Sequence, residues 1–166
     1  MGLDMYLNGS VYASRNDWKA FDALPQDKQD LKSVPQTSEY KAIIEASGIA
    51  DYVAPDGVGL SVEFIAGYWR KANQIHEWFV KNCGGGERDY GLYVSREDLQ
   101  SLVDTCKEVL ADKSKAKELL PTASGFFFGS TEYDEYYFQD LKETIKIAER
   151  CLKMPDRISF SYDSSW

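Results

Sequence analysis

The side chains best suited to chemistry lie in the stretch YWRKANQIHEWF, which runs from Tyr68 to Phe79. Two cations, Arg70 and Lys71, and the only histidine of the chain, His76, stand here among large aromatic residues. Guanidinium and ammonium groups hold phosphate, and histidine is the side chain that titrates near neutral pH without help. The stretch therefore raises two possibilities, a ligand-binding or proton-transferring site and a buried helix.

A helical wheel separates these side chains. The spacing predicts a helix over residues 68–82, in which successive residues turn by about 100°. His76 falls in a buried aromatic arc, whereas Arg70 points outward, about 120° away, so the two cannot easily hold one ligand. Asn73 lies on the same flank as His76 and could share a ligand with it. For His76 the alternative is a core histidine bonded to a carbonyl or a tyrosine; for Arg70 and Lys71 it is a solvated face paired with acids.

A second unusual stretch, GFFFGSTEYDEYYFQD, covers residues 125–140. Its first part, GFFFGS, predicts a buried apolar segment between two glycines. Thr131 and Asp134 fit a capping box, which would start a helix over residues 131–153. We predict that a ligand pocket would lie between this helix start and the helix over residues 68–82.

The acids and tyrosines of this helix start have two interpretations. Acids in a first turn complement the helix dipole and disfavour phosphate there, which is the simple explanation. A functional carboxylate such as Asp134 would instead bind a cation, hold Mg²⁺ or act as a base. Tyr133 and Tyr136 add aromatic surface with polar tips, a composition typical of ligand walls and interfaces.

The known hydrolase and nucleotide-binding motifs are not found in the sequence, which contains no G-x-S-x-G, Walker, H-E-x-x-H or Rossmann pattern. An enzyme would have to use His76 with Asp134 or Glu132, and nothing places a nucleophile beside the histidine. Catalytic residues and cofactors therefore stay unassigned, and binding is favoured over catalysis.

The chain has three widely spaced cysteines, Cys83, Cys106 and Cys151. Their spacing predicts reduced thiols and no metal site.

The charge of the chain limits its partners. Lys and Arg number 19 and Asp and Glu 27, which gives a net charge of −8 over 166 residues. Direct binding of nucleic acid or of an anionic membrane needs a basic surface, so we expect neither. The sequence has no apolar run long enough to span a membrane and no signal peptide, which predicts a cytoplasmic protein.

The hydrophobic pattern predicts an α+β single domain over residues 1–166, with a small antiparallel or mixed sheet packed by three main helices. Alternating apolar residues predict strands at 3–12, 57–65, 92–94 and 157–166. Apolar stripes with helical spacing predict further helices at 17–24, 38–48 and 95–110.

Four stretches, MGLDMYL, YWRKANQIHEWFV, LLPTASGFFFGSTEYDEYYF and SSW, together resemble a family of small uncharacterised proteins of bacteriophages and prophages. The resemblance covers most of residues 1–12 and 62–166. Residues 13–57 match no fixed pattern and are predicted to be a variable insertion. The family has no established activity, but the phage setting implies an accessory role in the host cytoplasm, such as host takeover or countering host defence.

Three functions follow from these observations. The first is a phage-type accessory protein that sequesters a nucleotide-like small molecule as a counter-defence, since aromatic walls stack bases and Arg or Lys holds phosphate. The second is an acidic inhibitor that binds a host protein of nucleic-acid processing or defence. The third is a small enzyme using His76 with a carboxylate. The candidate ligand-binding residues are Arg70, Lys71, Asn73, His76, Tyr133, Asp134 and Tyr136.

Overall fold

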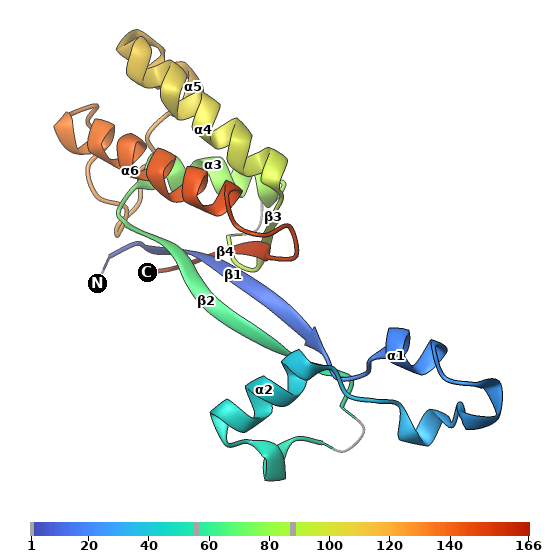
Figure 1. Cartoon of the computed structure of the whole chain (residues 1–166). Helices are drawn as coiled ribbons and strands as arrows, with labels where there is room; N and C mark the ends of the chain where they lie inside the picture. The colour runs from blue at the N-terminus through green and yellow to red at the C-terminus, as the bar shows by residue number, and fades with distance from the viewer. Residues whose placement is uncertain (1, 55–56, 87–88) are drawn as a thin grey trace. The chain divides into compact units, whose positions relative to one another are not determined.

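The protein has an α+β fold with one four-stranded antiparallel sheet, as the sequence predicts (Figure 1). The computed structural model describes residues 2–54, 57–86 and 89–166. The strands, in spatial order, are β2 (Gly59–Arg70), β1 (Asp4–Ser14), β4 (Ser159–Ser165) and β3 (Leu92–Val94). The α-helices are α1 (Trp18–Asp22), α2 (Ser38–Ser47), α3 (Asn73–Cys83), α4 (Arg96–Ala111), α5 (Ala116–Leu119) and α6 (Glu135–Leu152). Short 3₁₀ turns cover Gln26–Lys28, Leu31–Ser33, Ala50–Tyr52 and Lys113–Lys115.

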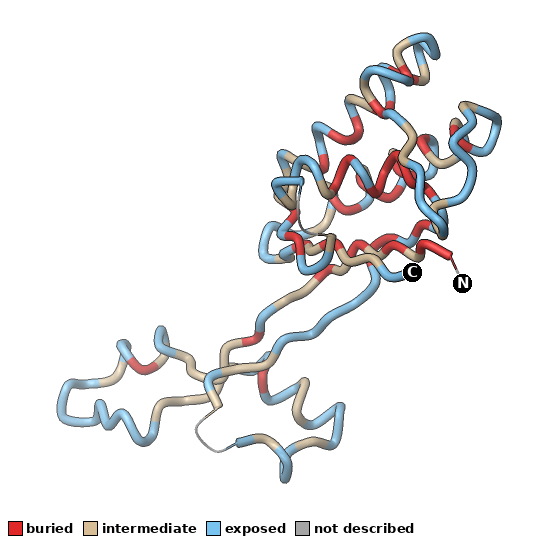
Figure 2. The backbone as a smooth tube through the Cα atoms, turned by 180° about the vertical axis from the view of Figure 1, so that it is seen from behind, coloured by how far each residue is buried: buried red, intermediate tan, exposed pale blue. Residues whose placement is uncertain are grey.

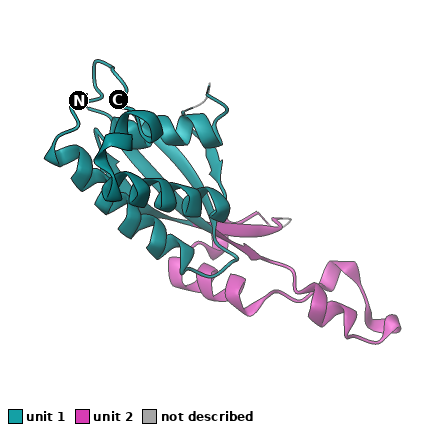
Figure 3. Ribbon diagram, turned by 90° about the horizontal axis from the view of Figure 1, so that it is seen from above, with its two compact units in different colours: residues 1–10, 63–166 teal, residues 11–62 magenta. Residues whose placement is uncertain are grey.

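The chain divides into two compact units (Figure 3). The first comprises Met1–Ser10 and Glu63–Trp166, and the second comprises Val11–Val62. The second unit contains α1 and α2, which are capped at their N-termini by Asp17 and Thr37. The predicted insertion, residues 13–57, falls inside the second unit, apart from Pro55 and Asp56, which lie outside the described residues. Its variability among relatives stays a prediction.

The core of the first unit lies between one face of the sheet and helices α3, α4 and α6 (Figures 1 and 2). Leu3, Met5 and Leu7 are fully buried on this face, which confirms the strand predicted from their alternation. Strand β4 runs antiparallel to β1 and places Tyr162 opposite Leu7. The Tyr162 ring stacks on Phe79 of α3 with centroids 4.3 Å apart, so this pair joins the sheet to the helix layer.

Helix α4 is the element that the sequence predicts best. Ser95 and Asp98 form a reciprocal capping box at its start. Its apolar stripe is buried, comprising Leu99, Leu102, Val103, Cys106 and Val109. Because a single face carries nearly all of the large apolar residues, the helix has one stable way to pack.

The prediction of a helix over residues 68–82 is wrong at its start. Residues 68–70 belong to β2, and α3 begins at Asn73. Burial alternates here as in a strand, because Trp69 is buried while Tyr68 and Arg70 are exposed. Lys71 then turns the chain with a left-handed φ of 62°. Within α3, Gln74 and His76 point about 200° apart, yet both are buried, so the start of this helix is covered on more than one face.

The segment GFFFGS is not buried, contrary to the prediction. Phe126 is 96% exposed, and Phe127 and Phe128 are only half-buried. The helix that follows also starts later than predicted, because Asp134 is its N-cap and accepts from the Tyr137 N–H. The proposed capping box between Thr131 and Asp134 is therefore wrong: Asp134 takes the cap role itself.

Candidate functional site

A pocket with a volume of about 300 Å³ lies between the junction of β2 with α3 and the start of α6. It occupies the place where the sequence predicts a ligand pocket. Four of the seven candidate residues line it: Arg70, Lys71, Asp134 and Tyr136. The rest of its lining consists of Gln74, Gly129, Ser130, Glu132, Tyr137 and Asp140. We call it the Lys71 pocket.

Lys71 is held in an unusual backbone conformation. Its φ is 62°, and it is the only non-glycine residue at positive φ within the described part of the chain. The Lys71 N–H donates to the Leu3 carbonyl at 2.8 Å, which fixes the turn. A Cβ atom at Gly129 would lie 3.0 Å from Lys71 Cβ, and one at Gly2 would lie 2.9 Å from Lys71 Cε. Two glycines thus make room for this lysine on both sides.

The neighbouring Arg70 is weakly engaged. Its Nε lies 3.8 Å from Asp4 Oδ1, and its side chain is 58% exposed. Asp4 also accepts a short hydrogen bond from the Tyr68 hydroxyl, and this bond raises the pKa of Tyr68. No hydrogen bond joins the terminal guanidinium nitrogens of Arg70 to any residue that the structure describes, so they are available to a ligand.

The opposite side of the Lys71 pocket is acidic. Asp140 is half-buried and accepts a hydrogen bond from Gln74 Nε2 at 3.2 Å. Burial raises the pKa of the Asp140 carboxyl, because the charged form loses water. The charge of Asp134 is partly balanced by the α6 N-terminus, since its Oδ1 accepts from the Tyr137 N–H at 3.1 Å. Tyr136 also lines the pocket and is 81% exposed.

His76 lies in the core instead of in this pocket. It is 4% exposed, and its Nδ1 is 2.8 Å from the Tyr162 hydroxyl. Phe128 and Trp166 pack edge-on against the imidazole, with centroids 5.2 and 5.8 Å away. Burial lowers the pKa of His76 and favours the neutral ring. A hydrogen bond to a tyrosine is what the alternative of a buried core histidine predicts. The arrangement lends no support to catalysis by His76.

Asn73 and Tyr133 organise the loop that leads into α6. Asn73 Nδ2 donates to the carbonyls of Phe128 and Ser130 at 3.1 and 2.9 Å, and its Oδ1 accepts from the Ala123 N–H at 2.9 Å. The Tyr133 hydroxyl accepts from the backbone at residue 122. Three of the seven candidates, Asn73, His76 and Tyr133, are not among the described residues that line the Lys71 pocket. Asn73 instead positions the loop that carries Gly129 and Ser130 into the pocket wall.

Six lining residues of the Lys71 pocket are absent from the seven candidates, and two of them, Gln74 and Asp140, are hydrogen-bonded to each other. A helical wheel places Gln74 nearly opposite His76, but both are buried because the start of α3 is covered on more than one face. Asp140 carries no signal in spacing or composition, since α6 has acidic residues on its other faces as well. Only the packing of α3 against α6 brings the amide and the carboxylate together.

Neither a metal-binding cluster nor a membrane-spanning helix is found among the described residues. Although three carboxylates line the Lys71 pocket, no group of three or more His, Cys, Asp or Glu side chains within residues 2–54, 57–86 and 89–166 is arranged to hold a metal ion. The described helices include none with the length and hydropathy needed to span a bilayer.

Comparison of the chain with protein-family models, with curated proteins and with solved structures gives no match.

Proposed function

We propose that this protein binds a small phosphorylated, nucleotide-like molecule in the Lys71 pocket and sequesters it without transforming it. The observation that carries the proposal is the conformation of Lys71. A left-handed backbone costs a residue with a Cβ about 1–2 kcal/mol, and such strain persists at sites where a side chain has a task. Glycine would fit this turn better, so the retained lysine indicates a role for its ammonium group.

The phosphate would lie at the basic end of the pocket. Arg70 and Lys71 are adjacent in the chain, and both line the pocket. The Lys71 ammonium and the terminal guanidinium nitrogens of Arg70 donate no hydrogen bond to a described residue. Both cations therefore have donors free for a ligand. Charge-assisted bonds of this kind are about twice as strong as neutral ones.

The remainder of the pocket suits a nucleobase. Tyr136 exposes its ring, and base stacking on an aromatic side chain contributes about 1–3 kcal/mol. Asp140 and Gln74 line the pocket, and carboxylate and amide oxygens accept hydrogen bonds of the kind that the amino and ring N–H groups of a purine donate. The acids Glu132 and Asp134 oppose a highly charged ligand, which favours a monophosphate or a cyclic phosphate over a triphosphate.

The biological setting of the proposal rests on the resemblance to phage and prophage proteins. A phage protein that removes a nucleotide signal from the host cytoplasm would act as a counter-defence factor. The position of His76 outside this pocket is no obstacle to such a role, because sequestration needs affinity and no chemistry.

Isothermal titration calorimetry tests the proposal. The probes are adenosine and guanosine monophosphates, their 3′,5′-cyclic forms and the unphosphorylated nucleosides. We expect at least one nucleotide to bind, and Lys71→Met or Arg70→Met to weaken it about tenfold or more. Lys142→Met removes the same charge outside the Lys71 pocket and serves as the control. Silence with every nucleotide, or equal affinity for nucleosides and nucleotides, would overturn the proposal.

A second candidate function, an acidic inhibitor that docks onto a host protein, is favoured by one specific observation. Phe126 is 96% exposed on the loop before α6, and aromatic residues are enriched at protein interfaces. The net charge of −8 suits a basic partner. A pull-down from bacterial lysate that recovers one stoichiometric protein with wild type, and loses it with Phe126→Ser, would support this function. A lysate that yields no stoichiometric partner would count against it.

A further inference from the structure

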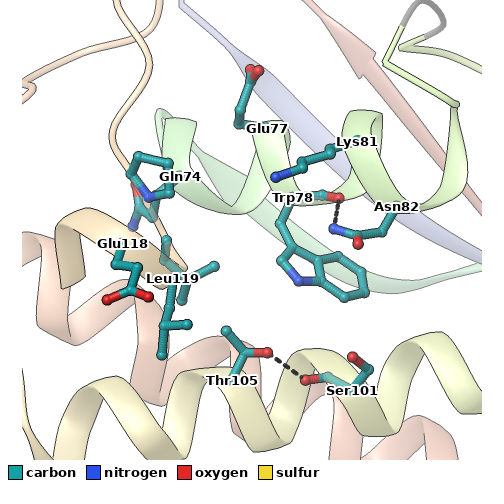
Figure 4. Close-up of a pocket in the computed structure, with 11 residues that line it drawn as sticks. Gln74, Glu77, Trp78, Lys81, Asn82, Ser101, Thr105, Glu118 and Leu119 are labelled. Carbon is teal, nitrogen blue, oxygen red and sulfur yellow. Dashed lines mark hydrogen bonds between the residues drawn. The ribbon is translucent and has the colours of Figure 1, made fainter. Parts of the chain in front are cut away.

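A second pocket, with a volume of about 210 Å³, is formed by α3, α4 and the chain around α5 (Figure 4). Its apolar wall consists of Trp78, Leu119, Leu120 and Pro121. Polar groups from α3 and α4 complete it, and Gln74 is the one residue that it shares with the Lys71 pocket. We call it the Trp78 pocket; it plays no part in the function proposed above.

Trp78 supplies a hydrogen-bond donor that the protein does not use. The residue is only 8% exposed, and its indole Nε1 donates to no described residue. Every fully buried side-chain nitrogen and oxygen in the described ranges has a partner, so this unpartnered N–H is not fully buried. Figure 4 shows the indole nitrogen facing the hollow. Buried indoles normally find a partner, which indicates that a ligand or water completes this one.

The rim of the Trp78 pocket carries opposite charges on different helices. Lys81 lies along α3 at the rim of the pocket, while the carboxylate of Glu77 points away from it (Figure 4). Glu118 of α5 lies on the other side, near Leu119. Neither Lys81 nor Glu118 forms an ion pair with a residue within the described ranges. The pocket therefore offers an exposed cation and an exposed anion over one apolar wall, although the charge of Glu118 also acts on Lys115 of the neighbouring turn.

From this arrangement we infer that the Trp78 pocket binds a small amphipathic zwitterion, a free amino acid with an apolar side chain. Its carboxylate accepts hydrogen bonds from Trp78 Nε1 and from the Lys81 ammonium. Its own ammonium group faces Glu118, and its hydrocarbon side chain packs against Leu119 and the indole. A ligand with either charge alone would leave one of the two rim charges uncompensated.

The design of the test uses the indole N–H itself. In ¹⁵N–¹H spectra each of the four tryptophans gives one indole signal, and Trp78→Phe identifies that of Trp78. The probes are L-leucine and L-phenylalanine, together with N-acetyl-L-leucine, which lacks the ammonium, and L-leucine methyl ester, which lacks the carboxylate. Binding is followed by the shift of the Trp78 signal as each probe is added.

The expected result is a saturable shift of the Trp78 signal with at least one free amino acid. Both blocked analogues should bind about tenfold more weakly or worse. Lys81→Met and Glu118→Gln should each weaken binding of the amino acid to a similar extent, whereas Lys142→Met should leave its affinity unchanged. The inference is overturned if neither amino acid shifts the Trp78 signal at millimolar concentration. Equal binding of a blocked analogue, or unchanged affinity in Lys81→Met, would overturn it as well. These outcomes are independent of the nucleotide titrations.

Discussion

Replacing Lys71 by glycine should make the protein more stable, although it removes a large side chain. Lys71 has a φ of 62°, which costs a residue with a Cβ about 1–2 kcal/mol. Glycine relieves that cost but loses about 0.5–1 kcal/mol more backbone entropy on folding. The net expectation is a gain of about 0.5–1 kcal/mol, or about 1–4 °C in Tm for a chain of this size.

The alanine variant is the matched control. Lys71→Ala loses the same ammonium and the same aliphatic stem as Lys71→Gly, but it keeps the Cβ and therefore the strain. Urea unfolding of the two variants isolates the backbone effect. The free energy of unfolding of Lys71→Gly should exceed that of Lys71→Ala by about 0.5–1 kcal/mol. If Lys71→Gly is less stable than Lys71→Ala, the backbone is not strained by its Cβ, and the reasoning that assigns a role to this lysine fails.

Three further predictions concern the frame around the pockets. Thr144→Val should cost about 1–3 kcal/mol in urea unfolding, because it leaves the buried Trp69 Nε1 without the acceptor now 2.9 Å away. Arg96→Ala should cost about 2–3 kcal/mol, because this guanidinium donates to four carbonyls at and beyond the end of α6; Arg96→Lys should not restore the loss. Burial lowers the pKa of His76, so the unfolded chain protonates first as the pH falls below about 6.5. Wild type should therefore lose more stability than His76→Gln between about pH 7 and 5.

Each of these has an outcome that contradicts it. Thr144→Ser keeps the hydroxyl and should stay near wild type; a loss equal to that of valine would point to packing in place of the hydrogen bond. Full rescue by Arg96→Lys would show that one charge suffices at the end of α6. Identical pH profiles for wild type and His76→Gln would mean that the histidine is not buried in its neutral form.

Much of the fold follows from the hydrophobic pattern, because elements with a single apolar face have one way to pack. The alternation of Leu3, Met5 and Leu7 and the stripe of α4 are of this kind. The secondary structure of residues 68–70 is harder to predict, because the aromatic residues before the helix fit both the two-residue period of a strand and the 3.6-residue period of a helix. The deciding feature is the left-handed turn at Lys71, and no composition rule predicts that a lysine adopts it.

The candidate site was predicted in part for the same reason. Arg70 and Lys71 stand out because they are cations in an acidic chain, and the structure places them beside Asp134 and Tyr136. The exposure of Phe126 and the pairing of Gln74 with Asp140 arise from the way the loop and α6 pack on α3. Such contacts are long-range in sequence and leave no local pattern.

The central claim is that Lys71 is retained at a cost to stability because it holds a phosphorylated ligand. It is tested most directly by calorimetric titration of wild type and Lys71→Gly with the nucleotide that binds wild type best. The account predicts that the glycine variant, although at least as stable, binds that nucleotide about tenfold more weakly or worse. Equal affinity in the two proteins, or no heat from wild type with any nucleotide, would contradict it.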